Sequence, residues 1–286
     1  MITGKTRVCG IIGDPIEHTL SPAMQNAAFT GKGLDYVYLP FRVPAGQLEK
    51  AVQGLRALDF AGVNVTIPHK VAVMPLLDEI DGLAEYIGAV NTIVNRNGVL
   101  KGYNTDAAGF YEALVAGHIT IPQKKIVVLG AGGAARAIAF ILADKRAKLT
   151  ILNRTPGSAE AIARLIFKAL RVEVKTGELT DKNLKSSLVE ADILVNTTSL
   201  GMSPRTSDTP VPAALLSKDQ VVVDIIYNPW QTRLLKEAGQ KGSSVISGLE
   251  MLVRQGTAAF ELWTGVKAPV DIMRKAVEEA LKKNEE

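Results

Sequence analysis

The sequence contains one cysteine and three histidines, and each of these shortages excludes a class of function. Its one cysteine, Cys9, cannot form a disulfide within the chain and fits a reducing compartment. The three histidines have no metal-ligand spacing, and no G-x-S-x-G motif of a serine hydrolase is present. No run reaches the roughly 18 apolar residues of a membrane span, and the N-terminus lacks the apolar segment of a signal peptide. We therefore expect a soluble, cytoplasmic protein without a metal site.

An excess of one charge is also missing. Lys and Arg number 33 and Asp and Glu number 29, which gives a net charge of +4, and the basic residues are scattered singly or in pairs. This distribution argues against nucleic acid as a partner and weakly favours an anionic ligand. Hydrophobic residues make up 47% of the 286 residues, which is a globular composition. A chain of this length predicts two domains of roughly 100 to 150 residues.

Short apolar segments alternate with amphipathic ones, which predicts an α/β fold with open, largely parallel sheets. In the first hundred residues we expect strands at 7–13, 36–43, 62–67 and 89–94, and helices at 21–29, 45–58 and 70–80. A second α/β unit starts near residue 123, with later strands at 172–177, 192–199, 221–227 and 243–248. Two final helical patterns, at 248–265 and 269–284, have no strand to alternate with, so we expect them to pack on the first domain or across a cleft.

A glycine-rich turn follows the strand KKIVVLG. Gly130, Gly132 and Ala135 occupy the positions of a G-x-G-x-x-G/A fingerprint between a strand and a helix. In such a site the first glycine makes the tight turn, the second admits a pyrophosphate, and the third small residue lets the helix pack closely on the strand. The helix N-terminus then faces the phosphates. A dinucleotide site is the favoured interpretation, and a plain structural turn is the alternative.

The end of the next strand indicates which dinucleotide binds. An NAD site usually places Asp or Glu there, whereas this sequence has Asn153, Arg154 and Thr155. A guanidinium can bind a 2'-phosphate through two hydrogen bonds and stack on the adenine. NADP is therefore the expected cofactor, with a solvated arginine at a strand end as the alternative.

The segment GVNVTIPHK, residues 62–70, begins as a buried strand and ends in polar groups. Asn64 and Thr66 share one face of the strand, and ligands of open α/β sheets bind beyond the carboxyl ends of the strands. Lys70 emerges there, where partial desolvation can lower the pKa of a lysine until it exchanges protons with a substrate oxygen. A solvated lysine at the start of a helix is the alternative. The neighbouring His69 is expected to be structural.

Two further stretches, GAVNTIV and KGYNTDAAGF, place polar residues in segments that are otherwise fit for burial. Asn91 lies in a predicted strand, and Asp106 follows another strand just before the second domain. Taken alone, Asp106 is explained as the cap of the next helix. Ser21 is a predicted N-cap with Pro22 at the first helical position. Thr19, two residues earlier, has no evident capping role.

Nine motifs occur in an order that resembles the shikimate dehydrogenase family along the whole chain. They are HTLSP, NVTIPHK, AVNTI, GYNTDAAGF, GAGGAAR, NRT, NTTSLGM, DIIYNP and GLEMLVRQG. The resemblance implies NADPH-dependent reduction of 3-dehydroshikimate to shikimate in aromatic amino-acid biosynthesis. It also implies two α/β domains that face a cleft, the second of Rossmann type. We expect the substrate domain at 1–106 plus 245–286 and the NADP domain at 107–244.

The resemblance also implies roles for individual residues. Lys70 matches the catalytic lysine and Asp106 its paired carboxylate. The implied substrate-binding residues are Thr19, Ser21, Asn64, Thr66, Asn91, Tyr227 and Gln255. The implied cofactor-binding residues are Gly130, Ala131, Gly132, Gly133, Ala134, Asn153, Arg154, Thr155, Thr198, Met202 and Gly248.

Thr19 and Gln25 depart from the family, which often has serine and histidine at these positions. We expect Gln25 to lie away from the reacting centre, and Thr19 to alter the fit at the carboxylate end of the substrate. A quinate/shikimate dehydrogenase of broader substrate and cofactor use is therefore an alternative. A catalytically silent NADP-binding sensor is another, which the presence of both Lys70 and Asp106 disfavours. The expected partner is a small-molecule substrate rather than nucleic acid or a membrane, with a homodimer as a possible assembly.

Overall fold

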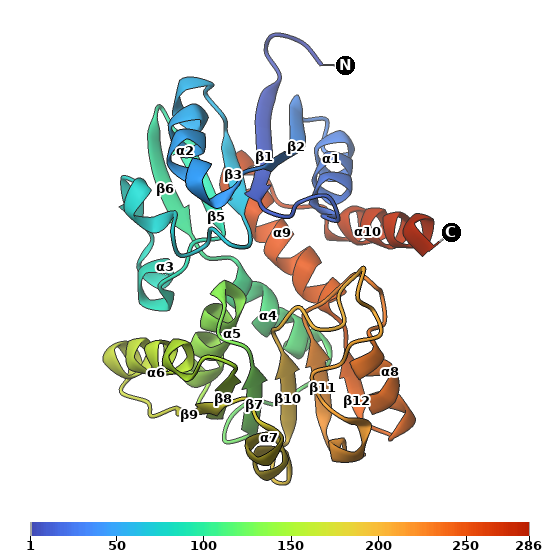
Figure 1. Ribbon diagram of the computed structural model, residues 1–286. Helices are drawn as coiled ribbons and strands as arrows, with labels where there is room; N and C mark the ends of the chain where they lie inside the picture. The colour runs from blue at the N-terminus through green and yellow to red at the C-terminus, as the bar shows by residue number, and fades with distance from the viewer. Residues whose placement is uncertain (1, 286) are drawn as a thin grey trace. The chain divides into compact units, whose positions relative to one another are not determined.

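The computed structural model describes residues 2–285, so Met1 and Glu286, at the ends of the predicted substrate domain, lie outside the described residues. The chain divides into two compact units. Unit 1 comprises Met1–Thr105 and Val253–Glu286, and unit 2 comprises Asp106–Leu252. Each unit has its own sheet flanked by helices (Figure 1). Among residues 2–285, no helix has the length and apolarity needed to cross a bilayer.

The sheet of unit 1 has six strands in the order β2-β1-β3-β5-β6-β4. Its strands are β1 (Arg7–Gly13), β2 (Tyr36–Arg42), β3 (Gly62–Val65), β4 (Glu79–Ile80), β5 (Thr92–Arg96) and β6 (Val99–Tyr103). The pairs β1/β2, β1/β3 and β4/β6 are parallel, whereas β3/β5 and β5/β6 are antiparallel. The β5/β6 pair is an antiparallel hairpin because a two-residue turn, Asn97 and Gly98, both with positive φ, joins β5 directly to β6.

Helices cover both faces of this sheet. The elements of unit 1 are α1 (Ser21–Gly31), η1 (Ala45–Gln47), α2 (Leu48–Ala57), η2 (Met74–Leu76), α3 (Gly82–Ile87), most of α9 (Gly248–Thr264) and α10 (Val270–Glu285). On one face, Leu48, Val52 and Leu55 of α2 join a core with Val63 and Ile93. On the other face, α1 and α9 meet where the rings of Phe29 and Phe260 stack at 5.3 Å. Helix α10 packs against α1 (Figure 1).

The helix predicted at 70–80 is wrong. That segment makes one turn, with the Val73 amide donating to the His69 carbonyl at 2.9 Å, and then the short η2 and β4. Pro75 has no amide hydrogen to continue a helix, and the β-branched Val71 and Val73 are weak helix formers. The segment instead pairs with the edge of the sheet through β4.

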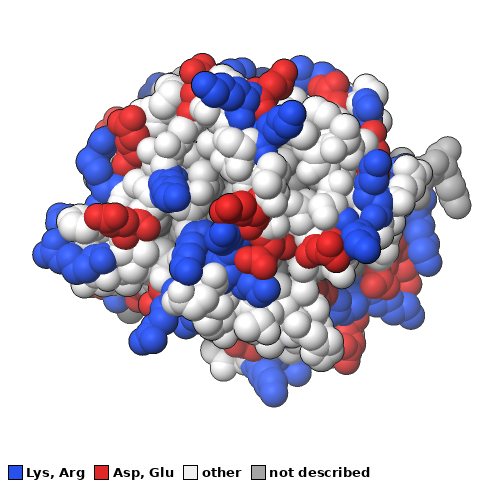
Figure 2. All heavy atoms as spheres, turned by 90° about the horizontal axis from the view of Figure 1, so that it is seen from below, with Lys and Arg blue, Asp and Glu red and all other residues white. Residues whose placement is uncertain are grey.

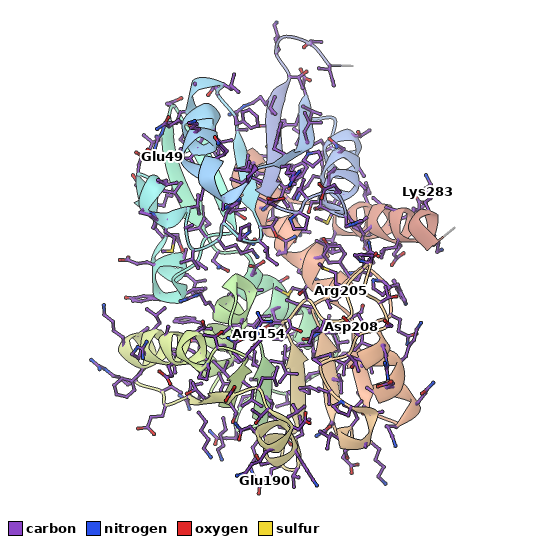
Figure 3. All side chains as sticks on the ribbon, in the orientation of Figure 1. Glu49, Arg154, Glu190, Arg205, Asp208 and Lys283 are labelled. Atoms are coloured by element: carbon purple, nitrogen blue, oxygen red, sulfur yellow. The ribbon has the colours of Figure 1, made fainter. Side chains whose placement is uncertain are left out.

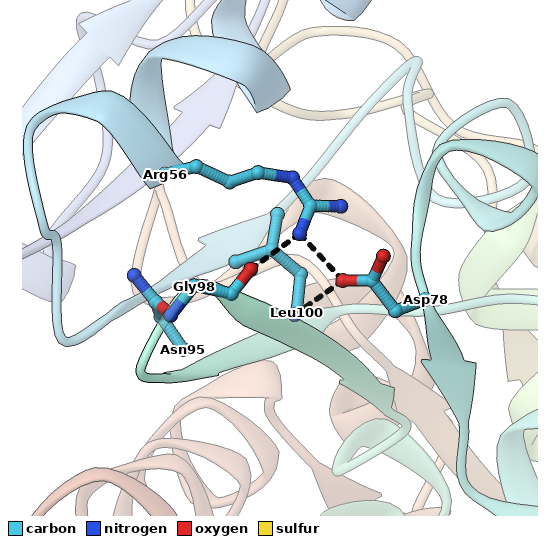
Figure 4. Close-up of polar contacts among 5 residues, drawn as sticks. All are labelled: Arg56, Asp78, Asn95, Gly98 and Leu100. Carbon is cyan, nitrogen blue, oxygen red and sulfur yellow. Dashed lines mark hydrogen bonds and ion pairs between the residues drawn. The ribbon is translucent and has the colours of Figure 1, made fainter.

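A polar contact holds this segment to the β5–β6 hairpin (Figure 4). Arg56, at the end of α2, pairs with Asp78 Oδ2 at 2.5 Å and also donates to the carbonyl of Gly98. The same Asp78 oxygen accepts from the Leu100 amide at 2.7 Å. The Arg56 guanidinium and the Leu100 amide hold the pKa of Asp78 below its usual value. The contact therefore joins α2, β4 and the hairpin.

The sheet of unit 2 has six parallel strands in the order β12-β11-β10-β7-β8-β9. They are β7 (Lys125–Leu129), β8 (Lys148–Asn153), β9 (Lys175–Glu178), β10 (Ile193–Asn196), β11 (Val221–Asp224) and β12 (Ser244–Ile246). This is the doubly wound order of a Rossmann domain, and the predicted fold class is confirmed. The strand order reverses between β7 and β10, the point at which such sheets bind dinucleotides.

The helices of unit 2 lie on both faces of this sheet (Figure 1). They are α4 (Asp106–Ala116), α5 (Gly133–Asp144), α6 (Pro156–Leu170), α7 (Asp181–Leu188), η3 (Ala213–Leu215) and α8 (Arg233–Gln240). On one face, leucines of α7 and α8 join Val127, Leu194 and Val222 in a single core. On the surface drawn in Figure 2, acidic and basic side chains are interspersed.

Candidate active site

The glycine-rich turn leaves β7 at the switch point of unit 2. Gly130 has φ of +103°, which is strained for any other residue, and a Cβ atom there would lie 2.6 Å from Thr197 Oγ1. Two hydrogen bonds fix this close approach. The Gly130 amide donates to the Leu152 carbonyl, and the Thr197 amide donates to the Leu129 carbonyl, each at 2.9 Å. Glycine is therefore required at this turn by the protein itself.

Gly132 is different, because nothing in the described protein requires a glycine there. It is the N-cap of α5, with φ of −82°, and a Cβ atom on it would meet no atom within 4 Å. The space beside it is open to a ligand that approaches the backbone closely, as a pyrophosphate does. Ala135 is fully buried, so the third small position serves packing. The neighbours Ala131, Gly133 and Ala134 are half-buried at the same turn. These residues fit the phosphates of a dinucleotide.

The segment NRT lies at the carboxyl end of β8. Asn153 is the last residue of the strand, and its side-chain amide donates to the Thr155 carbonyl at 2.9 Å, which shapes the turn. Thr155 is the N-cap of α6. Arg154 between them is exposed and makes no hydrogen bond or ion pair with residues 2–285. Figure 3 shows Arg154 at the same end of the sheet as Arg205 and Asp208, with Glu190 at the opposite end. An unpaired guanidinium there is available to an anion.

Arg136 is a second cation that the sequence interpretation missed. It follows the glycine turn on α5 and is half-buried, and burial lowers the pKa of its guanidinium. Within residues 2–285 no acidic side chain pairs with it. A partly desolvated arginine without a counter-ion favours an anionic ligand. Arg136 could have been found from the sequence, because it directly follows the glycine-rich segment GAGGAA.

A buried polar network lies under the loop that follows β10. The Asn196 side chain donates to Asp224 Oδ1 at 3.1 Å, and its oxygen accepts from the Thr198 amide at 3.0 Å and from Thr198 Oγ1 at 2.7 Å. Asp224 also accepts from the Ile226 amide at 3.1 Å and from Thr232 Oγ1 at 2.7 Å. The network thus links the ends of β10 and β11 to the N-cap of α8.

Burial raises the pKa of Asp224 to about 6, although the three donors oppose the rise. Relative to the ordinary value of 3.8, ionised Asp224 costs roughly 3 kcal/mol of folding free energy at neutral pH. The pKa of Asp224 is higher in the folded protein than in the unfolded chain. The free energy of unfolding is therefore highest below pH 3.8, where the carboxyl is protonated in both states, and it decreases as the pH rises through about 6.

Two other predicted cofactor residues lie near the same strand ends. Met202 is partly exposed in the loop after β10. Gly248 begins α9, and a Cβ atom there would collide with the carbonyl of Ile225 just after β11. The close approach of Gly248 to the Ile225 carbonyl is therefore a sufficient reason for the glycine.

In unit 1, polar side chains gather where β3 ends and β5 begins. The Asn64 side chain accepts from Tyr38 Oη at 2.7 Å and donates to Thr92 Oγ1 at 3.0 Å and to the Asn91 carbonyl at 3.2 Å. Asn91 donates to Thr105 Oγ1 at 2.9 Å and accepts from the Thr105 amide at 2.7 Å. Asn91 directly precedes β5 rather than lying within it. Both amide hydrogens of Asn64 are thus bound within the protein.

Lys70 and Asp106 are each attached to this cluster through the backbone. The carbonyl of half-buried Lys70 accepts from the Val90 amide at 2.8 Å, next to Asn91. Asp106 is buried and directly follows Thr105, which is bonded to Asn91. It is the first residue of α4. His69 is buried with its Nε2 2.6 Å from the Val43 carbonyl, which fits the structural role expected for it.

The start of α1 corrects two predictions. Ser21 is the first helical residue rather than the N-cap; Leu20 occupies that position, and no side chain caps the helix. Thr19 does have a local role, because its hydroxyl accepts from the Ser21 amide at 3.3 Å. The sequence motif misplaced the cap by one residue because Pro22 fits either of the first two helical positions.

Four more predicted residues are placed as follows. Thr66 lies one residue beyond β3 and is half-buried. Gln255 is buried on α9, and Tyr227 is half-buried in the segment after β11. Gln25 is fully buried, and its side chain donates to the Gly256 carbonyl at 2.9 Å, so it joins α1 to α9. Among the described residues, no cluster of three or more His, Cys, Asp or Glu could hold a metal ion.

Models of three protein domains match most of this chain. The shikimate dehydrogenase substrate binding domain matches residues 11–93, shikimate / quinate 5-dehydrogenase matches 114–229, and the shikimate 5'-dehydrogenase C-terminal domain matches 248–278. The shikimate dehydrogenase (NADP(+)) of Methanothermobacter thermautotrophicus is 48% identical over 288 residues, covering 99% of this chain and 100% of that protein. The chain belongs to the shikimate dehydrogenase family.

Solved structures of the family have the same fold. A crystal structure of a shikimate dehydrogenase in complex with NADP+ is 45% identical, covers 98% of each chain and has a TM-score of 0.92. The enzyme of Thermus thermophilus, in complex with NADP(H) and shikimate, is 39% identical, covers 96% of this chain and 100% of that chain, and has a TM-score of 0.85. The predicted resemblance is confirmed, as is NADP as the cofactor of the family.

The structure brings the predicted residues together within each unit. The dinucleotide turn, the NRT segment and Thr198 follow β7, β8 and β10, which are neighbours or next neighbours in the sheet of unit 2. In unit 1, Asn64 is hydrogen-bonded to the Asn91 carbonyl, and the backbone of Lys70 is hydrogen-bonded to Val90, the residue before Asn91. Asp106 and Tyr227 belong to unit 2.

Proposed function

We propose that this chain catalyses the NADPH-dependent reduction of 3-dehydroshikimate to shikimate, with Lys70 and Asp106 as its catalytic residues. Unit 1 is the substrate-binding domain and unit 2 the NADP-binding domain. The observation that carries the proposal is the buried polar cluster of Asn64, Asn91 and Thr105 in a chain whose glycine turn fits a dinucleotide. The enzyme acts in the cytoplasm, and a homodimer stays a prediction.

The cofactor is held by residues at three strand ends of unit 2. The amides at the start of α5 face the pyrophosphate, next to the open space at Gly132. Arg154, with no partner in the described chain, binds the 2'-phosphate, and Asn153 and Thr155 shape the turn around it. Thr198 and Met202 contact the cofactor from the loop after β10. When bound, the nicotinamide supplies the hydride for the ketone carbon.

The substrate is held by short polar side chains of unit 1. A ring with several hydroxyls and one carboxylate needs many fixed donors and acceptors, and amide and hydroxyl side chains at strand ends lose little entropy on binding. Thr19 and Ser21 lie at the start of α1, and Asn91, Thr66 and Gln255 are buried or half-buried. Asn64 contributes mainly by holding Asn91 and Thr92 in place, because its amide hydrogens are bound to them. Tyr227 of unit 2 is the remaining proposed substrate-binding residue.

Lys70 and Asp106 perform the proton transfer. Reduction of a ketone leaves negative charge on its oxygen, and the Lys70 ammonium donates a proton to that oxygen from Nζ. The Asp106 carboxylate orients the lysine and a substrate hydroxyl. The Lys70 carbonyl accepts from the amide of Val90, next to Asn91, and Asp106 directly follows Thr105, whose amide donates to Asn91.

Substrate preference tests this function. We expect rapid NADPH oxidation with 3-dehydroshikimate and a much lower kcat/KM with 3-dehydroquinate, measured as initial rates with the purified protein. A pocket whose polar groups fit one set of hydroxyls discriminates strongly against a ligand that leaves them unpaired. Comparable rates with both ketones would instead assign a quinate/shikimate dehydrogenase. NADPH binding without turnover of either ketone would favour the sensor.

A further inference from the structure

Gln25 is a fully buried polar side chain for which the proposed mechanism has no use. It lies on α1, and its Nε2 donates to the carbonyl of Gly256 on α9 at 2.9 Å. Its Oε1 is buried as well and accepts no hydrogen bond from residues 2–285. The two amide atoms cannot be exchanged, because a backbone carbonyl only accepts and must therefore face the amide hydrogens.

Stability alone does not explain an amide at this position. The hydrogen bond to Gly256 is favourable, but a buried acceptor without a donor is costly, and the cost is at least as large as the gain. A methionine has a similar length and shape and no such oxygen. A carbon atom, however, stays roughly 3.3 to 3.6 Å from a carbonyl oxygen, whereas the amide nitrogen approaches it to 2.9 Å. Gln25 therefore lets α1 and α9 lie closer together than an apolar side chain of its size would.

The two helices approach closely at this point. A Cβ atom on Gly256 would collide with the end of the fully buried Met24 side chain and lie 3.0 Å from its Sδ. Glycine is therefore needed on α9 where it faces α1. Four residues further along each helix, the rings of Phe29 and Phe260 stack at 5.3 Å. The contact between α1 and α9 thus continues over successive turns from Gln25 and Gly256 onward.

Two of the proposed substrate-binding residues lie beside this contact. Ser21 precedes Gln25 by four residues on α1, so the two side chains are on the same face of the helix. Gln255 directly precedes Gly256 on α9. Ser21 and Gln255 are both buried. The hydrogen bond from Gln25 to Gly256 therefore fixes the separation of the backbone segments that carry Ser21 and Gln255.

We propose that Gln25 is a positioning residue for the substrate, because it sets the distance between Ser21 and Gln255. The inference rests on the proposed function through the substrate contacts of these two residues. Gln25 itself touches neither substrate nor cofactor. It holds two hydrogen-bonding groups at a fixed separation before the substrate arrives, so less conformational freedom is lost on binding.

The test is the steady-state kinetics of the full-length Gln25→Met protein at saturating NADPH. We expect the KM for 3-dehydroshikimate to rise by roughly 3-fold to 10-fold, the equivalent of about one hydrogen bond to the substrate. The kcat should stay within about 2-fold of the wild-type value, because the displaced groups hold the ground state and the transition state alike. The Kd of NADP+, measured by calorimetry, should not change because the dinucleotide turn lies in unit 2. The variant should melt at the wild-type temperature or higher, since the unpaired oxygen is gone.

Two further variants separate the hydrogen bond from packing. Gln25→His retains a ring N–H that can donate to the Gly256 carbonyl, so its KM should stay near the wild-type value. Gln220→Met is the matched control. Gln220 is another buried glutamine, and its Nε2 donates to the Leu188 carbonyl at 2.8 Å in unit 2. Its replacement should lower the melting temperature, because its Oε1 also accepts from the Ser217 amide at 3.2 Å, and should leave KM and kcat unchanged.

Four results would overturn the inference. If Gln25→Met keeps the wild-type KM while Gln255→Ala raises it, Gln255 binds the substrate but Gln25 does not position it. If both variants keep the wild-type KM, the substrate contact proposed for Gln255 fails and the inference fails with it. If Gln25→His raises the KM as much as Gln25→Met, the shape of side chain 25 rather than its hydrogen bond sets the affinity. A Gln25→Met protein that loses kcat, NADP+ affinity and thermal stability together would show a structural role alone. Turnover of 3-dehydroshikimate by the wild type tests the proposed function separately.

Discussion

Replacing Lys70 with alanine is expected to lower kcat for 3-dehydroshikimate reduction by about 10²-fold to 10⁴-fold, the usual contribution of a positioned proton donor. The loss falls on kcat because the ammonium acts on the charge that develops as the ketone is reduced. NADP+ affinity, measured by calorimetry, should stay at the wild-type value because the dinucleotide turn lies in unit 2. Asp106→Asn should lower kcat in the same assay.

Lys50→Ala is the control for this experiment. Lys50 is an exposed lysine of α2 in the same unit, and its removal should leave both kcat and KM unchanged. Near-normal turnover by Lys70→Ala would exclude Lys70 as the proton donor. A rise in the KM for 3-dehydroshikimate with kcat unchanged would make Lys70 a substrate-binding residue instead.

Replacing Arg154 with glutamine is expected to raise the KM for NADPH by roughly 10-fold to 100-fold, the equivalent of one hydrogen bond to a charged group. The KM for NADH should change little, because NADH has no 2'-phosphate for the guanidinium to bind. The preference for NADPH over NADH should therefore fall by about the same factor. Initial rates at fixed 3-dehydroshikimate and varied cofactor measure it.

Arg164→Gln provides the comparison. Arg164 lies on α6, one element further along the chain, where it forms an exposed pair with Glu160 at 3.6 Å. Such pairs contribute little, so cofactor kinetics should not change. Equal increases in the KM for NADPH and NADH after Arg154→Gln would mean that Arg154 contacts a part common to both cofactors. If neither KM changed, the contact with the 2'-phosphate would have to be assigned to another cation. Arg136 is the one nearest in sequence to the glycine turn.

The parts of the site that could be predicted from the sequence depend on short-range geometry. The fingerprint from Gly130 to Ala135 specifies its own turn, because the positive φ of Gly130 and the tight packing of Ala135 are local requirements. The Rossmann order of unit 2 follows from alternation of strands and helices. Two missed helices also had local signals, since Asp81 caps α3 and Thr180 caps α7.

The failures involve contacts that are distant in the sequence. The segment 70–80 has apolar residues at helical spacing, but Pro75 and the pairing of β4 with β6 decide its structure. The hydrogen bonds of Asn64 come from Tyr38 and Thr92, which the sequence pattern does not connect. Asp224 lies in the motif DIIYNP, yet its partners Asn196 and Thr232 are brought to it by the order of strands in the folded sheet. The predicted pairing of Lys70 with Asp106 stays a prediction.

The most direct test of the account is the fate of the transferred hydrogen. NADPH carrying deuterium at the reactive position of the nicotinamide is incubated with 3-dehydroshikimate and the purified protein, and the product is analysed by mass spectrometry and NMR. The account predicts shikimate with one deuterium on the carbon that was the ketone, and formation of that product slower by about 10²-fold to 10⁴-fold when Lys70→Ala replaces the wild type at the same enzyme concentration. Oxidation of the cofactor without labelled shikimate would contradict it.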